Sequence, residues 1–253
     1  MSSRRGSSPP RVLIVGATSA IARAVARGFA ARQAEFFLVG RQRERLEAVA
    51  ADLRTRGAGR IETLALDASD LASHDRLVSS AQAALSGLDV ALIAHGSLSD
   101  QPRCNVSAEA TLDALRINGT SVVSLLARLA PVFESQRSGA IVAISSVAGD
   151  RGRQSNYAYG AAKAMVSAFM QGLRNRLASH GVQVLTVKPG FVDTPMTASV
   201  KKGLLWATPD RVGADIVRAI DRRKDVLYTP WFWRFVMMVL RAIPEPIFKR
   251  LKL

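Results

Sequence analysis

Tyr159 and Lys163 are four residues apart, shortly after a predicted strand that ends in serine. On a helix, this spacing places both side chains on one face, one turn apart. A nearby ammonium favours a phenolate, so we expect Lys163 to lower the pKa of Tyr159 from its ordinary value of about 10. Such a phenol could act as a general acid or base near neutral pH. A hydroxyl from Ser146 could polarise a carbonyl oxygen or stabilise an alkoxide beside it.

The apolar run at residues 141–144 predicts the buried strand that positions this chemistry. Ser145 and Ser146 follow at its C-terminal end, and open α/β sheets bind ligands outside the C-terminal ends of their strands. Tyr157 is the rival phenol, but the residue four positions after it is Ala161, which supplies no cation. We interpret Tyr157 as a packing residue.

Ser146, thirteen residues before Tyr159, and the segment Tyr159-Gly160-Ala161-Ala162-Lys163 closely resemble the catalytic segment of the short-chain dehydrogenases/reductases. The resemblance implies an α/β Rossmann fold, with a doubly wound parallel sheet in a single domain. It also implies hydride transfer between a nicotinamide cofactor and a ketone or secondary alcohol. In the family an asparagine in a kinked helix completes the catalytic set, and Asn118 fits that place within a predicted helix over residues 107–134. The alternative role for Asn118 is a simple helix–helix hydrogen bond.

The predicted first strand, residues 11–15, leads into a turn and an alanine-rich helix that reaches about Arg32. This is the position of a phosphate-binding turn, where a helix N-terminus attracts a pyrophosphate. The family usually has three glycines here. This chain keeps Gly16 and carries Ala20 and Ala22 at the other two positions. The residues expected to contact the cofactor are Gly16, Thr18, Ser19, Ala20 and Ile21.

The second predicted strand, residues 35–40, ends where the adenosine ribose would lie. No acidic residue is present there to bind a free 2′-hydroxyl, and Arg41 could pair with a 2′-phosphate through both arms of its guanidinium. We therefore expect NADP(H). For Arg43 and Arg45 we favour a solvated role on the next helix, beside acidic residues that could pair with them: Glu44, Glu47 and Asp52.

Three further segments match cofactor-binding places of the family. Asp67, after the predicted strand 61–66, would hold the adenine amino group, and Ala94 and Gly96 follow the predicted strand 88–94. The histidine between them has no family role to inherit, and we leave His95 outside the catalytic set. After a predicted strand at residues 181–187, the segment from Lys188 to Met196 matches the family's Pro-Gly segment. It contributes Pro189, Gly190, Val192 and Thr194, of which the last two would hold the nicotinamide carboxamide.

The remaining organisation is one domain at residues 11–229, with a polar leader at 1–10 and an aromatic, basic tail at 230–253. The length of 253 residues suits one α/β domain, although two small ones would also fit. The single cysteine, Cys104, excludes an intrachain disulfide and fits a reducing, cytoplasmic setting. The apolar run after the leader is too short for a secretory signal. Residues 197–207 are expected to form a substrate lid.

The net charge of +15 suggests nucleic-acid binding, but the distribution of the charged residues favours another partner. Residues 222–253 hold eight basic and two acidic residues, interleaved with large aromatic side chains. This pattern suggests an anionic membrane surface. In this interpretation Trp231 and Trp233 lie among lipid headgroups, one helical face carries Phe235, Val236, Val239 and Leu240, and the lipid phosphates meet Arg234, Arg241, Lys249, Arg250 and Lys252. A solvated basic surface beside a dimer interface is the alternative.

The leading hypothesis is an NADP(H)-dependent carbonyl reductase or alcohol dehydrogenase. Its catalytic residues would be Asn118, Ser146, Tyr159 and Lys163, with Tyr159 and Lys163 also contacting the cofactor. The rival is a non-catalytic NADPH-binding protein at a membrane surface. The substrate is not fixed and could be lipid-linked or acyl, since part of the chain resembles reductases of polyprenyl-phosphate-linked keto-sugars. The family is usually dimeric or tetrameric, so a homodimer or homotetramer is expected, without metal or nucleic acid.

Overall fold

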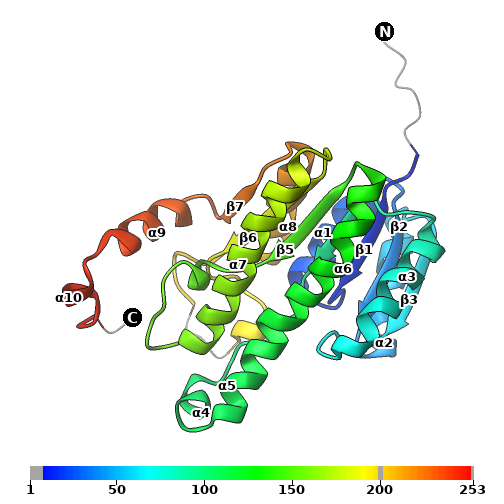
Figure 1. The fold of residues 1–253 in the computed structure, drawn as a ribbon. Coiled ribbons are helices and arrows are strands. Elements are labelled where there is room, and N and C mark those ends of the chain that lie inside the picture. The colour runs from blue at the N-terminus through cyan, green and yellow to red at the C-terminus, as the bar shows by residue number, and fades with distance from the viewer. Residues whose placement is uncertain (1–7, 199–201, 252–253) are drawn as a thin grey trace.

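Seven parallel strands form one sheet in the computed structural model, which describes residues 8–198 and 202–251 (Figure 1). Their order is β3-β2-β1-β4-β5-β6-β7. The strands are β1 (Arg11–Val15), β2 (Glu35–Gly40), β3 (Ile61–Ala65), β4 (Val90–Ile93), β5 (Ala140–Ile144), β6 (Gln183–Pro189) and β7 (Val226–Thr229). The expected doubly wound Rossmann fold is confirmed. The strand order reverses between β1 and β4, which places a ligand crevice outside their C-terminal ends.

The central strands are buried because helices cover both faces of the sheet. One face packs against α1 (Ala20–Ala30), α2 (Arg43–Thr55) and α8 (Pro209–Asp221), and the other against α3 (His74–Leu85), α6 (Ser121–Gln136) and α7 (Tyr157–Ala178). Side chains alternate along a strand, so β1 sends Val12 and Ile14 into one apolar core and Leu13 and Val15 into the other. Strands covered on both sides need continuous apolar runs, which is the pattern that predicted them.

The predicted helix over residues 107–134 consists of three consecutive segments. They are α5 (Ala108–Leu115), the π-helical turn η2 (Arg116–Thr120) and α6. A π-helical turn contains one residue more than the α-helical turn that it replaces, and Asn118 lies within it. A short helix that the sequence did not predict, α4 (Gln101–Val106), precedes them and is capped by Asp100, whose side chain accepts a hydrogen bond from the Arg103 N–H. Together α4 and α5 form a projecting lobe (Figure 1).

The C-terminal tail leaves the sheet edge after β7 and continues as α9 (Trp233–Ala242) and α10 (Glu245–Phe248), which extend away from the sheet (Figure 1). We call these two helices the arm. Trp233 and Met237 are buried and pack against Val147. The expected placement of Trp233 among headgroups is therefore wrong, because its indole packs against the domain. Val236 and Leu240 are partly buried in the same cluster. They do not share an exposed face with Phe235 and Val239.

Arg151 fastens the end of α9 to the loop between β5 and α7. Its guanidinium donates hydrogen bonds to the carbonyl oxygens of Leu240 and Ile243, each at 2.6 Å, and to Glu245 Oε2 at 2.9 Å. It also lies 3.6 Å from the centre of the Phe248 ring. A cation at a helix C-terminus satisfies carbonyls that have no partner within the helix. Within the described residues, no helix is both long and apolar enough to cross a bilayer.

Three sequence expectations fall partly outside the described residues. They concern residues 1–7 of the leader, residues 199–201 of the expected lid, and Lys252 of the tail.

Candidate active site

The structure brings Ser146, Tyr159 and Lys163 together at the C-terminal end of β5. Ser146 follows the strand and caps the short helix η3 (Val147–Gly149), its Oγ accepting a hydrogen bond from the Ala148 N–H at 3.1 Å. Tyr159 and Lys163 lie in the first two turns of α7. The Lys163 Nζ donates to the Ile144 carbonyl oxygen at 3.0 Å and lies 5.6 Å from the centre of the Tyr159 ring. The predicted Ser-Tyr-Lys constellation is thus present as a cluster.

The η3 segment and α7 are held in register by contacts between their backbones. The Ser145 hydroxyl donates to the Lys163 carbonyl oxygen at 2.9 Å and lies 2.8 Å from the Ser167 Oγ. A Cβ on Gly149 would lie 2.6 Å from the Lys163 carbonyl carbon, and one on Gly160 would lie 2.9 Å from the Ala148 carbonyl oxygen. Only glycine permits this approach, so these two glycines set the distance between Ser146 and the first turns of α7.

Asn118 is fully buried, and its amide is bonded on both sides. Its Oδ1 accepts from the Ser97 N–H at 2.9 Å, and its Nδ2 donates to the Ala114 carbonyl oxygen at 3.1 Å. These partners lie in the loop after β4 and in the preceding helical turn, so the amide does not bond to a neighbouring helix. The close helix–helix contact is made by Gly119 instead, where a Cβ would lie 3.4 Å from the Ala162 Cα.

Gly96 connects Asn118 with Lys163. Its φ of +151° lies in a region that favours glycine, and a Cβ there would stand 2.7 Å from Asn118 Oδ1 and 3.7 Å from Lys163 Nζ. The amide of Asn118 and the ammonium of Lys163 therefore face the same small space beside the β4 loop. The four predicted catalytic residues are placed around that space by β4, β5, η2 and α7.

The expectation of a lowered tyrosine pKa is wrong for the protein without cofactor. Burial raises the pKa of Tyr159 to about 12, and the Ser146 side chain offsets this only in part. Burial also lowers the pKa of Lys163 to about 8. Both shifts have one cause, since removing a charged form from water costs free energy. At neutral pH, Tyr159 therefore carries its proton and can donate it.

The turn after β1 departs from the family pattern without losing its shape. Gly16 has φ +83°, and a Cβ there would lie 2.5 Å from the His95 backbone nitrogen. The Ser19 hydroxyl caps α1, which starts at Ala20, so the helix N-terminus points at the crevice. Ala22 is fully buried in the apolar core, whereas Ala20 is only partly buried. Of the two alanines, Ala20 is thus the one whose methyl group reaches the turn's outer side, beside partly buried Thr18 and Ile21.

Arg41 follows β2 and is exposed. It lies near enough to Asp67 to help hold that carboxyl's pKa below its usual range, after the larger effect of the hydrogen bond from the Ser69 N–H at 2.9 Å. Arg43 and Arg45 are exposed at the start of α2. The expected pairing of these arginines with Asp52 is wrong, because Asp52 pairs with two others, Arg27 and Arg56.

His95 lies between Ala94 and Gly96 and is neutral. Burial lowers its pKa to about 3, and the nearby charge of Lys163 acts in the same direction. The Ser121 hydroxyl donates to the Ile117 carbonyl oxygen at 2.9 Å, so its oxygen accepts from His95 Nε2 at 2.8 Å. That assignment leaves Nδ1 as a buried acceptor without a partner in the described part of the chain. This tautomer holds the loop after β4 against η2 and α6.

The Pro-Gly segment begins where β6 ends, at Pro189. A Cβ on Gly190 would overlap the Trp233 indole, so the absence of a side chain at this position leaves room for the arm to pack against the domain. Val192 forms a parallel β-bridge with Ala207. The hydrogen bonds to Ala207 are made by the backbone groups of the residues before and after Val192, and not by Val192 itself. The Val192 N–H therefore points away from Ala207. The Thr194 Oγ lies 3.3 Å from the Thr197 hydroxyl.

Two features near this site escaped the sequence analysis. Tyr157 is 45% exposed and donates to Asn105 Oδ1 at 2.9 Å, so its interpretation as a packing residue is wrong. In the loop between η3 and α7, the Asp150 carboxylate accepts hydrogen bonds from Lys188 Nζ at 2.5 Å and from the Tyr228 hydroxyl at 2.7 Å. The sequence feature that could have indicated this network is a lysine near the end of a buried strand, because a buried lysine needs an acidic partner.

Replacing Gly96 by alanine should perturb the site and the fold together. The added methyl group would press on Asn118 Oδ1 in a backbone conformation that alanine rarely adopts. We expect a loss of about 1–3 kcal/mol in the free energy of unfolding, measured by urea titration. Gly172→Ala is the matched control: it lies inside α7 with open space around it, and should stabilise the protein by about 0.5–1 kcal/mol. An unchanged stability of Gly96→Ala would contradict this account of the cluster.

Comparison with known proteins assigns the chain to a family. The model of the short chain dehydrogenases matches residues 10–204. An uncharacterized oxidoreductase of Mycobacterium tuberculosis is 38% identical over 240 residues, covering 95% of this chain and 96% of that protein. Another, from Streptomyces coelicolor, is 36% identical over 250 residues, covering 97% of each chain.

The crystal structure of levodione reductase has the same fold, with a TM-score of 0.78 at 23% identity, over 87% of this chain and 95% of that one. The matched segment contains the whole Ser146, Tyr159 and Lys163 cluster. The chain is therefore an oxidoreductase of the short-chain dehydrogenase/reductase family.

Proposed function

We propose that the protein is an NADP(H)-dependent carbonyl reductase. The observation that carries the proposal is the protonated, buried Tyr159 beside the Ser146 hydroxyl and the Lys163 ammonium. Reduction of a ketone needs a proton donor at the carbonyl oxygen, and a phenol with a pKa of about 12 is in its donor form at neutral pH. The cofactor's nicotinamide would supply the hydride to the carbonyl carbon.

The chain's own groups would handle the oxygen. The Ser146 hydroxyl would donate a hydrogen bond to the carbonyl oxygen, and Tyr159 would pass its proton to the oxygen as it becomes an alkoxide. The resulting phenolate is stabilised by the Lys163 ammonium on the same helix face. Asn118 and Gly96 hold the Lys163 end of the cluster through the β4 loop. A reducing direction therefore suits the resting protonation state.

The residues present fit a dinucleotide. The α1 N-terminus, capped by Ser19 behind Gly16, would hold the pyrophosphate. Asp67 would hold the adenine end, beside Ala94 and Gly96, and the outward N–H of Val192 with the Thr194 hydroxyl would hold the carboxamide. Thr18, Ala20 and Ile21 are only partly buried, so the turn remains accessible to a pyrophosphate although Ala20 carries a methyl group.

The choice of NADP(H) rests on Arg41. Its guanidinium is exposed at the end of β2 and makes no ion pair within the described residues. The Arg41 charge contributes to lowering the pKa of Asp67, the residue expected at the adenine end of the cofactor. A 2′-phosphate carries the charge and the oxygen geometry that a guanidinium recognises.

Three buried polar atoms without a partner among the described residues lie in the loops after β4 and β5: Ser99 Oγ, Arg153 Nε and Asn156 Oδ1. Burial lowers the pKa of Arg153. A carbonyl compound that carries further hydrogen-bond acceptors and donors could satisfy these groups, and this class includes lipid-linked and acyl substrates. A cytoplasmic location and a homodimer or homotetramer stay predictions.

A non-catalytic NADPH-binding protein is the weaker candidate. Nucleotide binding alone does not require a buried phenol, an adjacent hydroxyl and a lysine kept partly desolvated, all of which cost stability. The assembled cluster therefore favours the enzyme.

Tyr159→Phe should reduce kcat by about 10²–10⁴-fold, because it removes the proton donor and keeps the ring. NADPH affinity, measured by fluorescence titration, should change little. Tyr157→Phe is the matched control, since Tyr157 lies on the same helix and its hydroxyl bonds, within the described part of the chain, only to the exposed Asn105. Turnover that survives in Tyr159→Phe would refute the role of this phenol.

Arg41→Asp should weaken NADPH binding by roughly 10- to 100-fold, since it replaces a charge-assisted hydrogen bond by repulsion of the 2′-phosphate. NADH binding should be much less affected. Arg45→Asp, an equal charge change on the neighbouring helix, should leave the preference intact. A wild-type protein that binds NADH more tightly than NADPH would overturn this assignment.

The pH dependence of kcat/KM should reveal the titration of the Lys163 ammonium. The lysine is charged below its pKa of about 8 and neutral above it, whereas Tyr159 keeps its proton until about pH 12. Because kcat/KM for the cofactor reflects the free enzyme, it should be level below pH 8 and fall about tenfold per pH unit above it. Lys163→Arg, whose charge persists, should abolish the fall in whatever activity remains. A level profile up to pH 10 would contradict the assignment.

A further inference from the structure

The outer side of α9 is apolar and stays exposed because its inner side is already used. Trp233 and Met237 fix the helix against Val147, and Arg151 fastens its C-terminal carbonyls. The outward residues are large and apolar, with exposed fractions of 66% for Trp231, 53% for Phe235 and 61% for each of Met238 and Val239. A helix held in this way cannot bury them by rotating.

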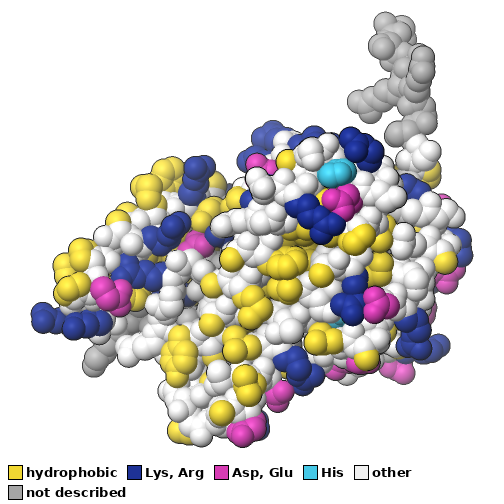
Figure 2. Space-filling view, in the orientation of Figure 1, with side chains coloured by type: hydrophobic (Ala, Val, Ile, Leu, Met, Phe, Trp, Pro, Cys, Tyr) yellow, Lys and Arg dark blue, Asp and Glu magenta, His cyan; other side chains and the backbone are white. Residues whose placement is uncertain are grey.

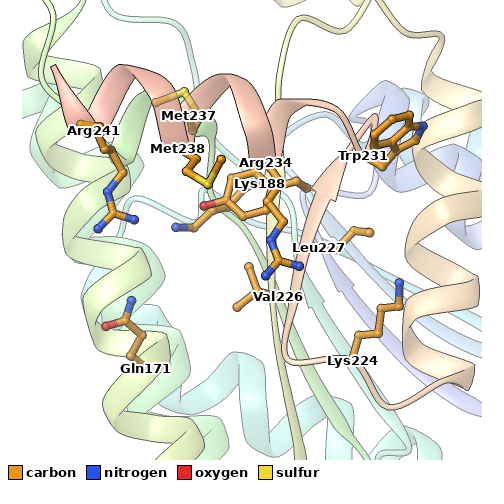
Figure 3. A pocket seen from close by; sticks show the side chains of 12 residues that line it. Gln171, Lys188, Lys224, Val226, Leu227, Trp231, Arg234, Met237, Met238 and Arg241 are labelled. Atoms are coloured by element: carbon orange, nitrogen blue, oxygen red, sulfur yellow. The ribbon is translucent and has the colours of Figure 1, made fainter.

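Basic side chains flank these apolar residues. A groove of ≈ 820 Å³ lies between α7, β7 and α9, and Figure 3 shows four cationic side chains around it. They are Lys188, Lys224, Arg234 and Arg241, and no carboxylate of the described residues lines the groove. Asp150 neutralises Lys188. The other three have no ion-pair partner within residues 8–198 and 202–251, and Glu245, the acidic residue of the arm, is held by Arg151.

The cations and the apolar side chains alternate on one stripe. Trp231, Arg234, Met238 and Arg241 follow one another at helical spacings of three and four, and all four line the groove. Phe235 and Val239 form the adjacent exposed row. Figure 2 shows basic and apolar surfaces interspersed over the arm. An interfacial helix has this composition, with aromatic residues for the headgroup boundary and arginines for lipid phosphates.

We propose that this surface docks the protein on a bilayer containing anionic phospholipid. We define the docking surface as Trp231, Arg234, Phe235, Met238, Val239 and Arg241. Its apolar side chains enter the boundary between headgroups and acyl chains, and its two arginines bind lipid phosphates, with Lys224 at the rim of the groove. The helix lies in the plane of the interface, as its ten residues are too few to span a bilayer.

Charge complementarity selects the bilayer over a second copy of the chain. Two copies meeting through this surface in a twofold arrangement would bring Arg234 and Arg241 against their own equivalents, without a carboxylate to separate them. An anionic lipid surface supplies both the negative charge and the apolar phase that the surface lacks.

Docking is structurally linked to the catalytic domain but does not depend on the proposed reaction. Trp233 touches Gly190 and meets the Phe191 ring edge-on at 5.5 Å, and Phe191 stacks on Trp206 at 5.4 Å. Leu204 and Leu205, which precede Trp206 in the chain, are exposed. The expected lid at residues 197–207 is thus linked to the arm through the Phe191 ring.

The test is flotation of the full chain with phosphatidylcholine vesicles, with and without phosphatidylglycerol. Wild type should float with the anionic vesicles at low salt, much less at high salt, and not with pure phosphatidylcholine. Arg234→Ser with Arg241→Ser should weaken partitioning roughly 30-fold, and Phe235→Ser with Val239→Ser should also release the protein. The matched controls, Val106→Ser with Leu112→Ser and Arg43→Ser with Arg45→Ser, remove exposed apolar and basic groups elsewhere and should float normally.

Circular dichroism and NADPH titration of every variant show that the domain is folded, so lost flotation with intact NADPH binding supports the proposal. Three results would overturn it: wild type that stays in solution with anionic vesicles at low salt, arm variants that float like wild type, or a dimer that the arm variants dissociate. Because flotation needs no turnover, an enzyme that floats but does not reduce carbonyls would refute only the proposed reaction.

Discussion

The contact between the η3 backbone and the first turns of α7 is the constraint on which the site depends. Two glycines, Gly149 and Gly160, allow main chain to touch main chain there, and the Ser145 hydroxyl locks the contact through the Lys163 carbonyl. Ser146 is carried by one side of this contact, and Tyr159 and Lys163 by the other. Their relative positions are consequently set by rigid backbone, which is how a site avoids reorganisation during the reaction.

That same tight packing determines the protonation states. Excluding water from the cluster raises the pKa of the phenol and lowers that of the ammonium, and the hydrogen bond with Ser146 offsets the first shift only in part. The sequence spacing indicates that a cation stands near a phenol, but it contains no information on how much water reaches either group. A pairing rule taken from spacing alone therefore predicted the wrong direction for Tyr159.

The sequence predicted those parts of the fold that depend on local patterns. Residues 35–40 were assigned as β2 with the observed bounds, because an apolar run between turn signals has few other interpretations. Spacing and chemistry point to three of the expected catalytic residues, a resemblance adds Asn118, and the structure places all four around one space. What the sequence could not reveal depends on long-range packing. The sequence around Trp233 is typical of a residue at a membrane interface, and it does not show that Gly190, more than forty residues earlier, leaves room for the indole. Arg151 looks like an ordinary loop residue in the sequence, and only the fold brings it to the carbonyl oxygens at the end of α9.

The π-helical turn at Asn118 has a consequence for how this helix can vary. The turn absorbs one extra residue, so the apolar positions of α6 are offset by one residue, or roughly 100° of helical rotation, from those that a regular continuation of α5 would give. If the turn became α-helical without a deletion, the apolar face of α6, with Leu125, Leu129 and Phe133, would rotate away from the sheet. At constant chain length, the core therefore preserves the irregular turn that contains Asn118, and only the loss of one residue could straighten the helix while keeping this interface aligned.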